Sequence, residues 1–216
     1  MSAAAGIGLG LVLGARHALD ADHLVAITAM LQERPGVRHA LWMAGLWSLG
    51  HSLTLLAVGL PIILLGLQFP EDLAVVAEVM VGVMLVVLGV RHAWAHGRRH
   101  DVPTAHSHSH SHSHVRTESA RPVARPLVIG LVHGLAGSHA VALLALAALT
   151  EPTGASVYLV MSALGMAVAM LAITALASLS MKQLMRGDLV RRVMVWSAAT
   201  MNVGFGSYLF IDSLLS

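Results

Sequence analysis

An ionisable motif lies inside the first long apolar segment of this chain. Residues 16–23 read Arg-His-Ala-Leu-Asp-Ala-Asp-His, whereas residues 3–14 and 24–31 carry no charged side chain. An apolar run of about 20 residues is long enough to cross a bilayer, and ionisable groups within such a run normally pair, line a cavity or bind an ion. Two imidazoles and two carboxylates so close together are potential metal ligands. The segment therefore predicts a membrane-spanning helix that carries a cation site.

The composition extends this prediction to the whole chain. Of the 216 residues, 56% are hydrophobic and 11% are charged, whereas soluble domains have about 25% charged residues. The long runs rich in Leu, Ala and Gly do not show the short alternating segments of a membrane barrel. We therefore predict an all-α polytopic membrane protein in the lipid bilayer, with six apolar segments at roughly 3–31, 40–67, 73–95, 126–150, 155–180 and 190–215.

The distribution of positive charge predicts the topology. Twelve of the 13 Lys and Arg residues flank or occupy the first, third and fifth connections, and the second and fourth connections have none. Positively charged loops face the cytoplasm. We therefore predict a bacterial-type inner (plasma) membrane protein with both termini outside and the connection at 96–125 in the cytoplasm. The same rule explains the sequence pI of 9.7 without a nucleic-acid partner.

The two halves of the chain resemble each other. The pattern His-x-Leu-x-x-x-His occurs at His17–His23 and again at His133–His139. Downstream, Gly50 aligns with Gly165 and Gly89 aligns with Gly204 at nearly constant spacing. Three helices in each half require the second half to insert upside down, as in many secondary transporters. We predict two inverted three-helix repeats, at residues 1–95 and 126–216, separated by the connection at 96–125.

The repeated motifs supply the candidate metal ligands. On an ideal helix His17, Asp20 and His23 share one face, whereas Asp22 points away from it. We therefore predict a break in the first helix near Asp20–Asp22, and a second break at Gly134–Gly137, where glycine favours irregular backbone. An alternative is that either aspartate pairs with Arg16. The predicted metal ligands are His17, Asp20, Asp22, His23, His51, His133 and His139.

Two further histidine features have simpler alternatives. His51 lies within the second apolar segment, where it is either a ligand or a buried histidine bonded to a carbonyl group. Histidine alternates with serine from His106 to His114, which predicts a cytoplasmic metal collector or, alternatively, a solvated linker. The chain has no cysteine, so any metal must be held by nitrogen and oxygen.

Residues 16–23 resemble the signature of the nickel/cobalt transporter family at every fixed position, and Leu49 to Ser52 resembles the next segment of that family. The resemblance implies uptake of Ni²⁺ or Co²⁺, with His17, Asp22 and His23 essential. The second His-x₅-His pattern is more similar to the shorter, urease-associated relatives. Cytoplasmic nickel-handling proteins are then expected partners.

Three functions are compatible with these features. The first is a secondary transporter that takes up Ni²⁺ or Co²⁺, with no resident cofactor and no enzymatic activity. The second is an exporter of the same fold, because the His-rich connection resembles that of related exporters. The third is an intramembrane hydrolase using Ser138 beside His139, for which the His-Glu-x-x-His motif of zinc proteases is absent.

Overall fold

The computed structural model describes residues 3–31, 36–68, 70–97, 124–148, 151–184 and 188–215. All regular structure within these ranges is helical, which confirms the predicted all-α class. The helices are α1 (Ala3–His17), α2 (Ala21–Leu31), α3 (Val37–Leu65), α4 (Glu71–Gly97), α5 (Ala124–Ala148), α6 (Pro152–Leu184) and α7 (Asp188–Leu215).

Several of these helices have the length and composition of membrane spans. Within the described ranges, three helical stretches are long and apolar enough to cross a bilayer, at Val37–Leu65, Glu71–Ala95 and Pro152–Ser180. Large apolar side chains such as Leu53, Val87 and Leu176 are more than 45% exposed on the outside of the bundle. Side chains of this kind normally leave water, so this surface suits lipid. These features support a multi-pass membrane protein.

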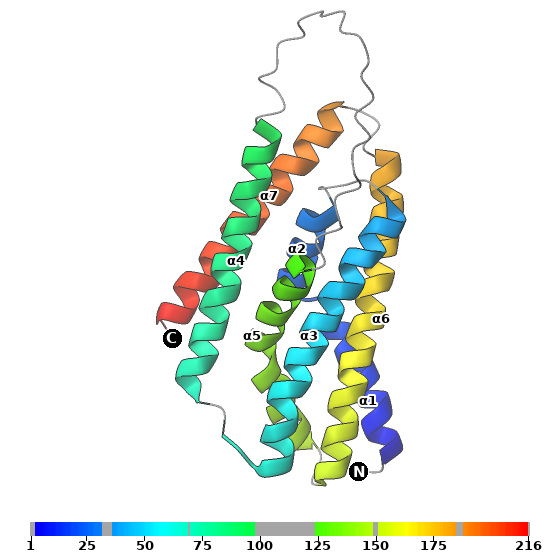
Figure 1. Cartoon of the computed structure of the whole chain (residues 1–216), viewed down its shortest axis with the longest axis vertical. Coiled ribbons are helices and arrows are strands. Elements are labelled where there is room, and N and C mark those ends of the chain that lie inside the picture. The colour runs from blue at the N-terminus through cyan, green and yellow to red at the C-terminus, as the bar shows by residue number, and fades with distance from the viewer. Residues whose placement is uncertain are drawn as a thin grey trace, which may run out of the picture.

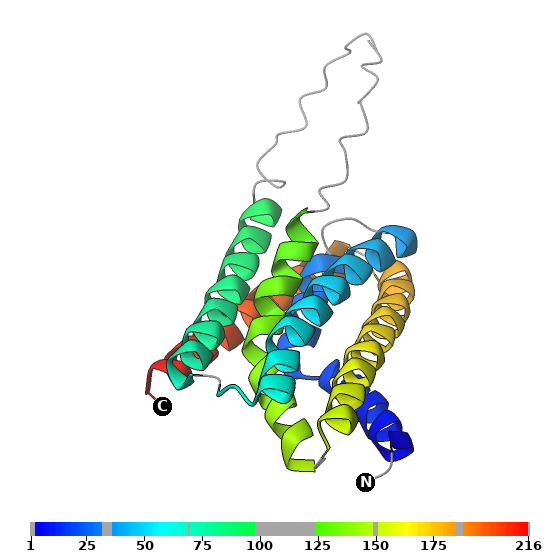
Figure 2. The ribbon, with the colours of Figure 1, turned by 60° about the horizontal axis from the view of Figure 1, so that its bottom comes forward.

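Helix α2 continues upward from α1, and from α2 onward successive helices run in alternating directions through the bundle (Figure 1). In Figure 1, α4 rises from the lower end to the upper end, and α7 descends to the C-terminus in the lower half. The N-terminal end of α1 also lies in the lower half, whereas α3 begins near the top and ends at the bottom. Figure 2 shows the same alternation from another side.

The first apolar segment is broken where its motif lies. Helix α1 ends at His17 and α2 begins at Ala21, which confirms the break predicted near Asp20–Asp22. The backbone tightens before the break, because the amides of Leu19 and Asp20 donate to the carbonyls of Arg16 and His17 at 2.9 and 3.0 Å. The Asp20 carbonyl then accepts from Leu24 at 3.1 Å, which starts α2.

The second predicted break is wrong. Helix α5 is continuous from Ala124 to Ala148, including the stretch Gly134–Gly137. At Gly134 the absence of a side chain serves helix contact instead, since a Cβ there would lie 2.6 Å from the carbonyl oxygen of His51 on α3. A stretch that packs closely along its neighbour loses contacts if it unwinds, so the helix stays regular.

Glycines set the closest helix contacts. Helix α1 packs on α6, α3 packs on α5, and α4 packs on α7. A Cβ at Gly14 would collide with the backbone carbonyl of Ser162, and one at Gly130 would collide with that of Trp47. Small residues of this kind allow membrane helices to approach at backbone distance. The contact at Gly14 therefore holds the end of α1, next to the break, against α6.

The Gly14 contact yields a stability prediction. Replacing Gly14 with alanine should lower the free energy of unfolding by about 1–3 kcal/mol, because α1 must move away from rigid backbone on α6. Gly8, on the same helix, is exposed, and a Cβ added there would meet no atom within 4 Å. Gly8→Ala should therefore leave stability unchanged or raise it by up to about 1 kcal/mol. Thermal unfolding in detergent measures both variants, and equal unfolding temperatures would contradict the packing argument.

Candidate metal centre

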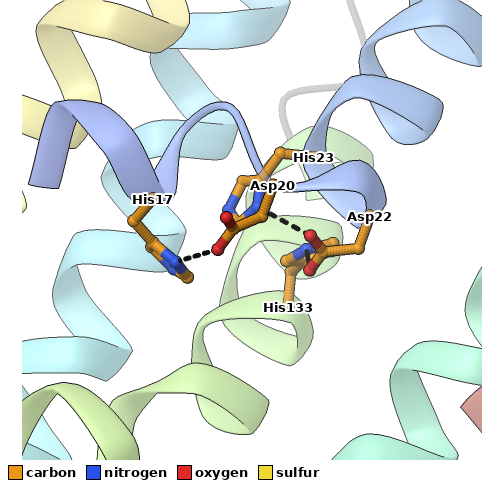
Figure 3. Close-up of polar contacts among 5 residues, drawn as sticks. All are labelled: His17, Asp20, Asp22, His23 and His133. Atoms are coloured by element: carbon orange, nitrogen blue, oxygen red, sulfur yellow. Dashed lines mark hydrogen bonds and ion pairs between the residues drawn. The ribbon is translucent and has the colours of Figure 1, made fainter. Parts of the chain in front are cut away.

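Four helices bring ionisable side chains together at the break. His17 is the last residue of α1, Asp22 and His23 lie in the first turn of α2, His51 is on α3 and His133 is on α5. Figure 3 shows His17 and His23 on either side of the break and Asp20 within it, with Asp22 directed at His133 on the facing helix. Residues 111 positions apart are thus in direct contact.

The imidazole rings form one cluster. His23 is at its centre, with ring centroids of His17, His51 and His133 at 4.7, 5.2 and 4.5 Å from its own. His23, His51 and His133 are at most 1% exposed, whereas the His17 side chain is 21% exposed. A cluster of four imidazoles, three of them buried, is costly unless its nitrogens find partners.

The two aspartates contact imidazoles, not Arg16, the partner considered from the sequence. The Asp22 carboxylate accepts hydrogen bonds from His133 Nε2 at 2.7 Å and from His23 Nδ1 at 3.2 Å. The break in the helix turns Asp22 toward the cluster, although it would point away on a continuous helix. Asp20 accepts a hydrogen bond from His17 Nδ1 at 2.7 Å. Carboxylate partners fix the tautomer and orientation of metal-binding histidines in this way.

The remaining ring nitrogens have no hydrogen-bond partner. Within the described part of the chain, these are His17 Nε2, His23 Nε2, both nitrogens of His51 and His133 Nδ1. Buried polar atoms are otherwise nearly always bonded. The alternative in which His51 bonds to a carbonyl group is therefore not supported. A group of free imidazole nitrogens, on rings whose other nitrogen often bonds a carboxylate, is suited to bind a cation.

Two overlapping groups of ligand atoms have nearly the spacing that a single ion requires. One nitrogen each from His17, His23 and His51 lie within 4.8 Å of one another, and so do one ligand atom each from Asp22, His23 and His133. Ligands about 2.1 Å from a common ion are at most about 4.2 Å apart. Small inward movements would therefore complete either set, and His23 belongs to both.

Of the other two predicted ligands, the structure places the side chain of Asp20 alone. The Asp20 side chain is 53% exposed and contacts His17, so it lies at the edge of the site. His139 belongs to α5, but its side chain lies outside the described residues. The His106–His114 tract also lies outside them.

Neighbouring side chains support the cluster. Trp47, one turn before His51 on α3, stacks on His23 at 5.7 Å between ring centroids and meets His133 edge-on at 5.5 Å. The sequence analysis did not identify Trp47. The only indication was its position four residues before His51, which places both side chains on the same face of a helix. Asn202 on α7 is fully buried and donates to the carbonyl of Val25 at 3.2 Å. This bond ties α7 to the short helix that carries Asp22 and His23.

Comparison with known proteins adds a relative. No protein-family model and no solved structure matches the chain. The chain is 29% identical over 168 residues to the urease accessory protein UreH of Bacillus sp. (strain TB-90), covering 78% of this chain and 74% of that protein. The name of that relative describes an accessory protein, in agreement with the prediction that the chain is not an enzyme. The similarity agrees with the urease-associated resemblance inferred from the motif, because this chain is similar to a urease accessory protein.

Proposed function

We propose that the protein is a secondary transporter that takes up Ni²⁺, with Co²⁺ as a second substrate. The observation that carries this proposal is the cluster of four histidines, three of them buried, with unpartnered nitrogens around the break between α1 and α2. The resemblance of residues 16–23 to the nickel/cobalt transporters and the similarity to a urease accessory protein both support it.

We assign the residues of the cluster as follows. His17, His23 and His51 supply imidazole nitrogens to the ion, and Asp22 with His133 forms the charged side of the site. His139 stays a further candidate ligand, since it aligns with His23. Asp20 orients His17 through its 2.7 Å bond. Imidazole and carboxylate ligands without thiolate suit first-row divalent ions such as Ni²⁺ and Co²⁺ better than Cu⁺.

Two inverted three-helix repeats are the proposed architecture, with α1 and α2 counted as one broken helix. The helix pairs support it, because α1 on α6 and α5 on α3 are corresponding pairs. The crossing points also correspond: Gly14 meets Ser162 and Gly130 meets Trp47. Likewise Gly165 meets Leu11 and Gly50 meets Leu127. Repeats of this kind permit alternating access to a central site.

The sidedness of the protein follows from the charge distribution. We place both termini outside and the connection at 96–125 in the cytoplasm of a bacterial-type inner membrane. The histidines from His106 to His114 then collect ions on the cytoplasmic side, where nickel-handling proteins receive them. Protonation of imidazole or carboxylate ligands expels a metal ion, which offers a route to coupling with protons.

Reconstitution tests this function. Liposomes containing the purified protein and an internal metal-sensitive dye should take up Ni²⁺ faster than empty liposomes, while Mg²⁺ should not enter. Cells that express the protein should accumulate radioactive nickel if it is an importer and lose it if it is an exporter. Cleavage of a membrane-embedded substrate without any metal flux would instead support the hydrolase. Absence of flux for Ni²⁺ and Co²⁺ in oriented, folded protein would overturn the proposal.

A further inference from the structure

A cavity lined by both polar and apolar side chains opens beside the histidine cluster. It has a volume of about 230 Å³ and lies between α1, α3 and α6. Its lining includes Arg16, His17, Asp20, Leu55, Tyr158 and Ser162. A water molecule occupies about 30 Å³ in the liquid, so six waters need about 180 Å³. The cavity is therefore large enough for a divalent cation that still holds its first hydration shell.

Among the described residues, the space beside Trp47 on the other side of the cluster is nearly filled. Between α2, α3 and α6 only about 10 Å³ remains, surrounded by Ile27, Met30, Met43, Trp47 and Thr174. This volume is at or below the limit for a single water molecule. Along α3, residues 40–44 line this closed side and Leu55 lines the open cavity. The two spaces therefore lie toward opposite ends of the bundle, with the histidines between them.

Trp47 is the bulky group between the histidines and the closed side. It lines the closed space, stacks on His23 and is 1% exposed. Its indole Nε1 has no hydrogen-bond partner within the described part of the chain, so no polar bond must break for the ring to move. The neighbouring Met30 and Met43 side chains are flexible and can adapt to such a movement.

In the alignment of the two repeats, the position equivalent to Trp47 holds a much smaller residue. Counting back three positions from Gly50 and from Gly165 gives Trp47 and Ser162. The two residues also occupy matching crossing points, because Gly130 packs on the Trp47 carbonyl and Gly14 packs on that of Ser162. The same position in the two halves thus holds an indole on the closed side and a hydroxymethyl group on the open side.

We propose that the cavity at Ser162 admits a hydrated divalent cation to His17 and Asp20, and that the Trp47 indole is the gate that blocks the corresponding path on the other side. This rests on the proposed transport function for the identity of the ion. The ion loses water as it passes Asp20 and His17, because His23, His51 and His133 beyond them are at most 1% exposed. Movement of the Trp47 ring then opens the way out.

Cysteine labelling of this cysteine-free chain tests the gate without using nickel. Ser162 and Thr174 are both 3% exposed and both lie on α6, so Ser162→Cys and Thr174→Cys are matched reporters. With a small cationic methanethiosulfonate reagent and purified protein, Ser162→Cys should react about tenfold faster or more, because buried thiols react only through local opening. Equal rates, or faster reaction at position 174, would overturn the proposal.

Substitution of Trp47 provides a second test of the gate. Adding Trp47→Ala should raise the labelling rate of Thr174→Cys by about tenfold or more, whereas Trp47→Phe should retain most of the protection. Gel filtration shows whether each variant is folded. If Trp47→Ala does not fold, the comparison of Ser162→Cys with Thr174→Cys in the protein that retains Trp47 still tests the proposal. An unchanged rate in folded Trp47→Ala would refute the gate. If labelling follows this pattern but Ni²⁺ flux is absent, the gate stands and the proposed substrate fails.

Discussion

Replacing His23 with alanine is expected to abolish Ni²⁺ transport. His23 is fully buried, lies within 5.2 Å of three other imidazole centroids and belongs to both groups of possible ligands. Loss of an outer hydrogen-bond partner typically weakens a metal site 10–100-fold, so loss of a ligand shared by both groups should cost at least about 100-fold. Uptake of radioactive nickel by cells and by liposomes measures the effect.

The matched control for this variant is His39→Ala. His39 is half-buried near the start of α3, away from the cluster, and its replacement should leave uptake near the native rate. His23→Gln provides a second variant that fills more of the space left by the imidazole. Equal expression and gel-filtration behaviour separate loss of transport from loss of folding. Near-native uptake by folded His23→Ala would refute the assigned site.

The two aspartates are expected to differ strongly when each is changed to asparagine. Asp22 contacts both His23 and His133, and its side chain is 25% exposed. Asp22→Asn removes the negative charge that offsets the cation in a poorly hydrated place, so transport should fall by about 100-fold. Asp20 contacts His17 and is 53% exposed. Water can replace part of its role, so Asp20→Asn should reduce transport by less than about tenfold.

Binding of Ni²⁺ to the purified variants checks this difference independently of movement through the membrane. The dissociation constant should rise far more for Asp22→Asn than for Asp20→Asn. Asp22→Glu keeps the charge but lengthens the side chain, so partial recovery would show that charge contributes separately from geometry. Equal defects in Asp20→Asn and Asp22→Asn would contradict the separation of roles that the structure indicates.

The sequence was sufficient to predict a helical membrane protein and the break in its first helix. Long uncharged runs interrupted by a dense ionisable motif have few stable arrangements in lipid, because backbone groups must bond internally. The same reasoning failed at Gly134–Gly137. Glycine permits both irregular backbone and close helix packing, and only the neighbouring helix decides between them. There the carbonyl of His51 on α3 approaches the position of the missing side chain.

The sequence alone predicted which side chains could hold an ion, since imidazole and carboxylate groups in an apolar segment carry that chemistry wherever the chain places them. Tertiary structure decided which of them lie together. Asp22 points away from His17 and His23 on a continuous helix, but the break at residues 18–20 directs it to His133, 111 residues further along the chain. The structure likewise set Trp47 against His23. Contacts between distant segments depend on how the helices pack, and helical periodicity carries no information about that packing.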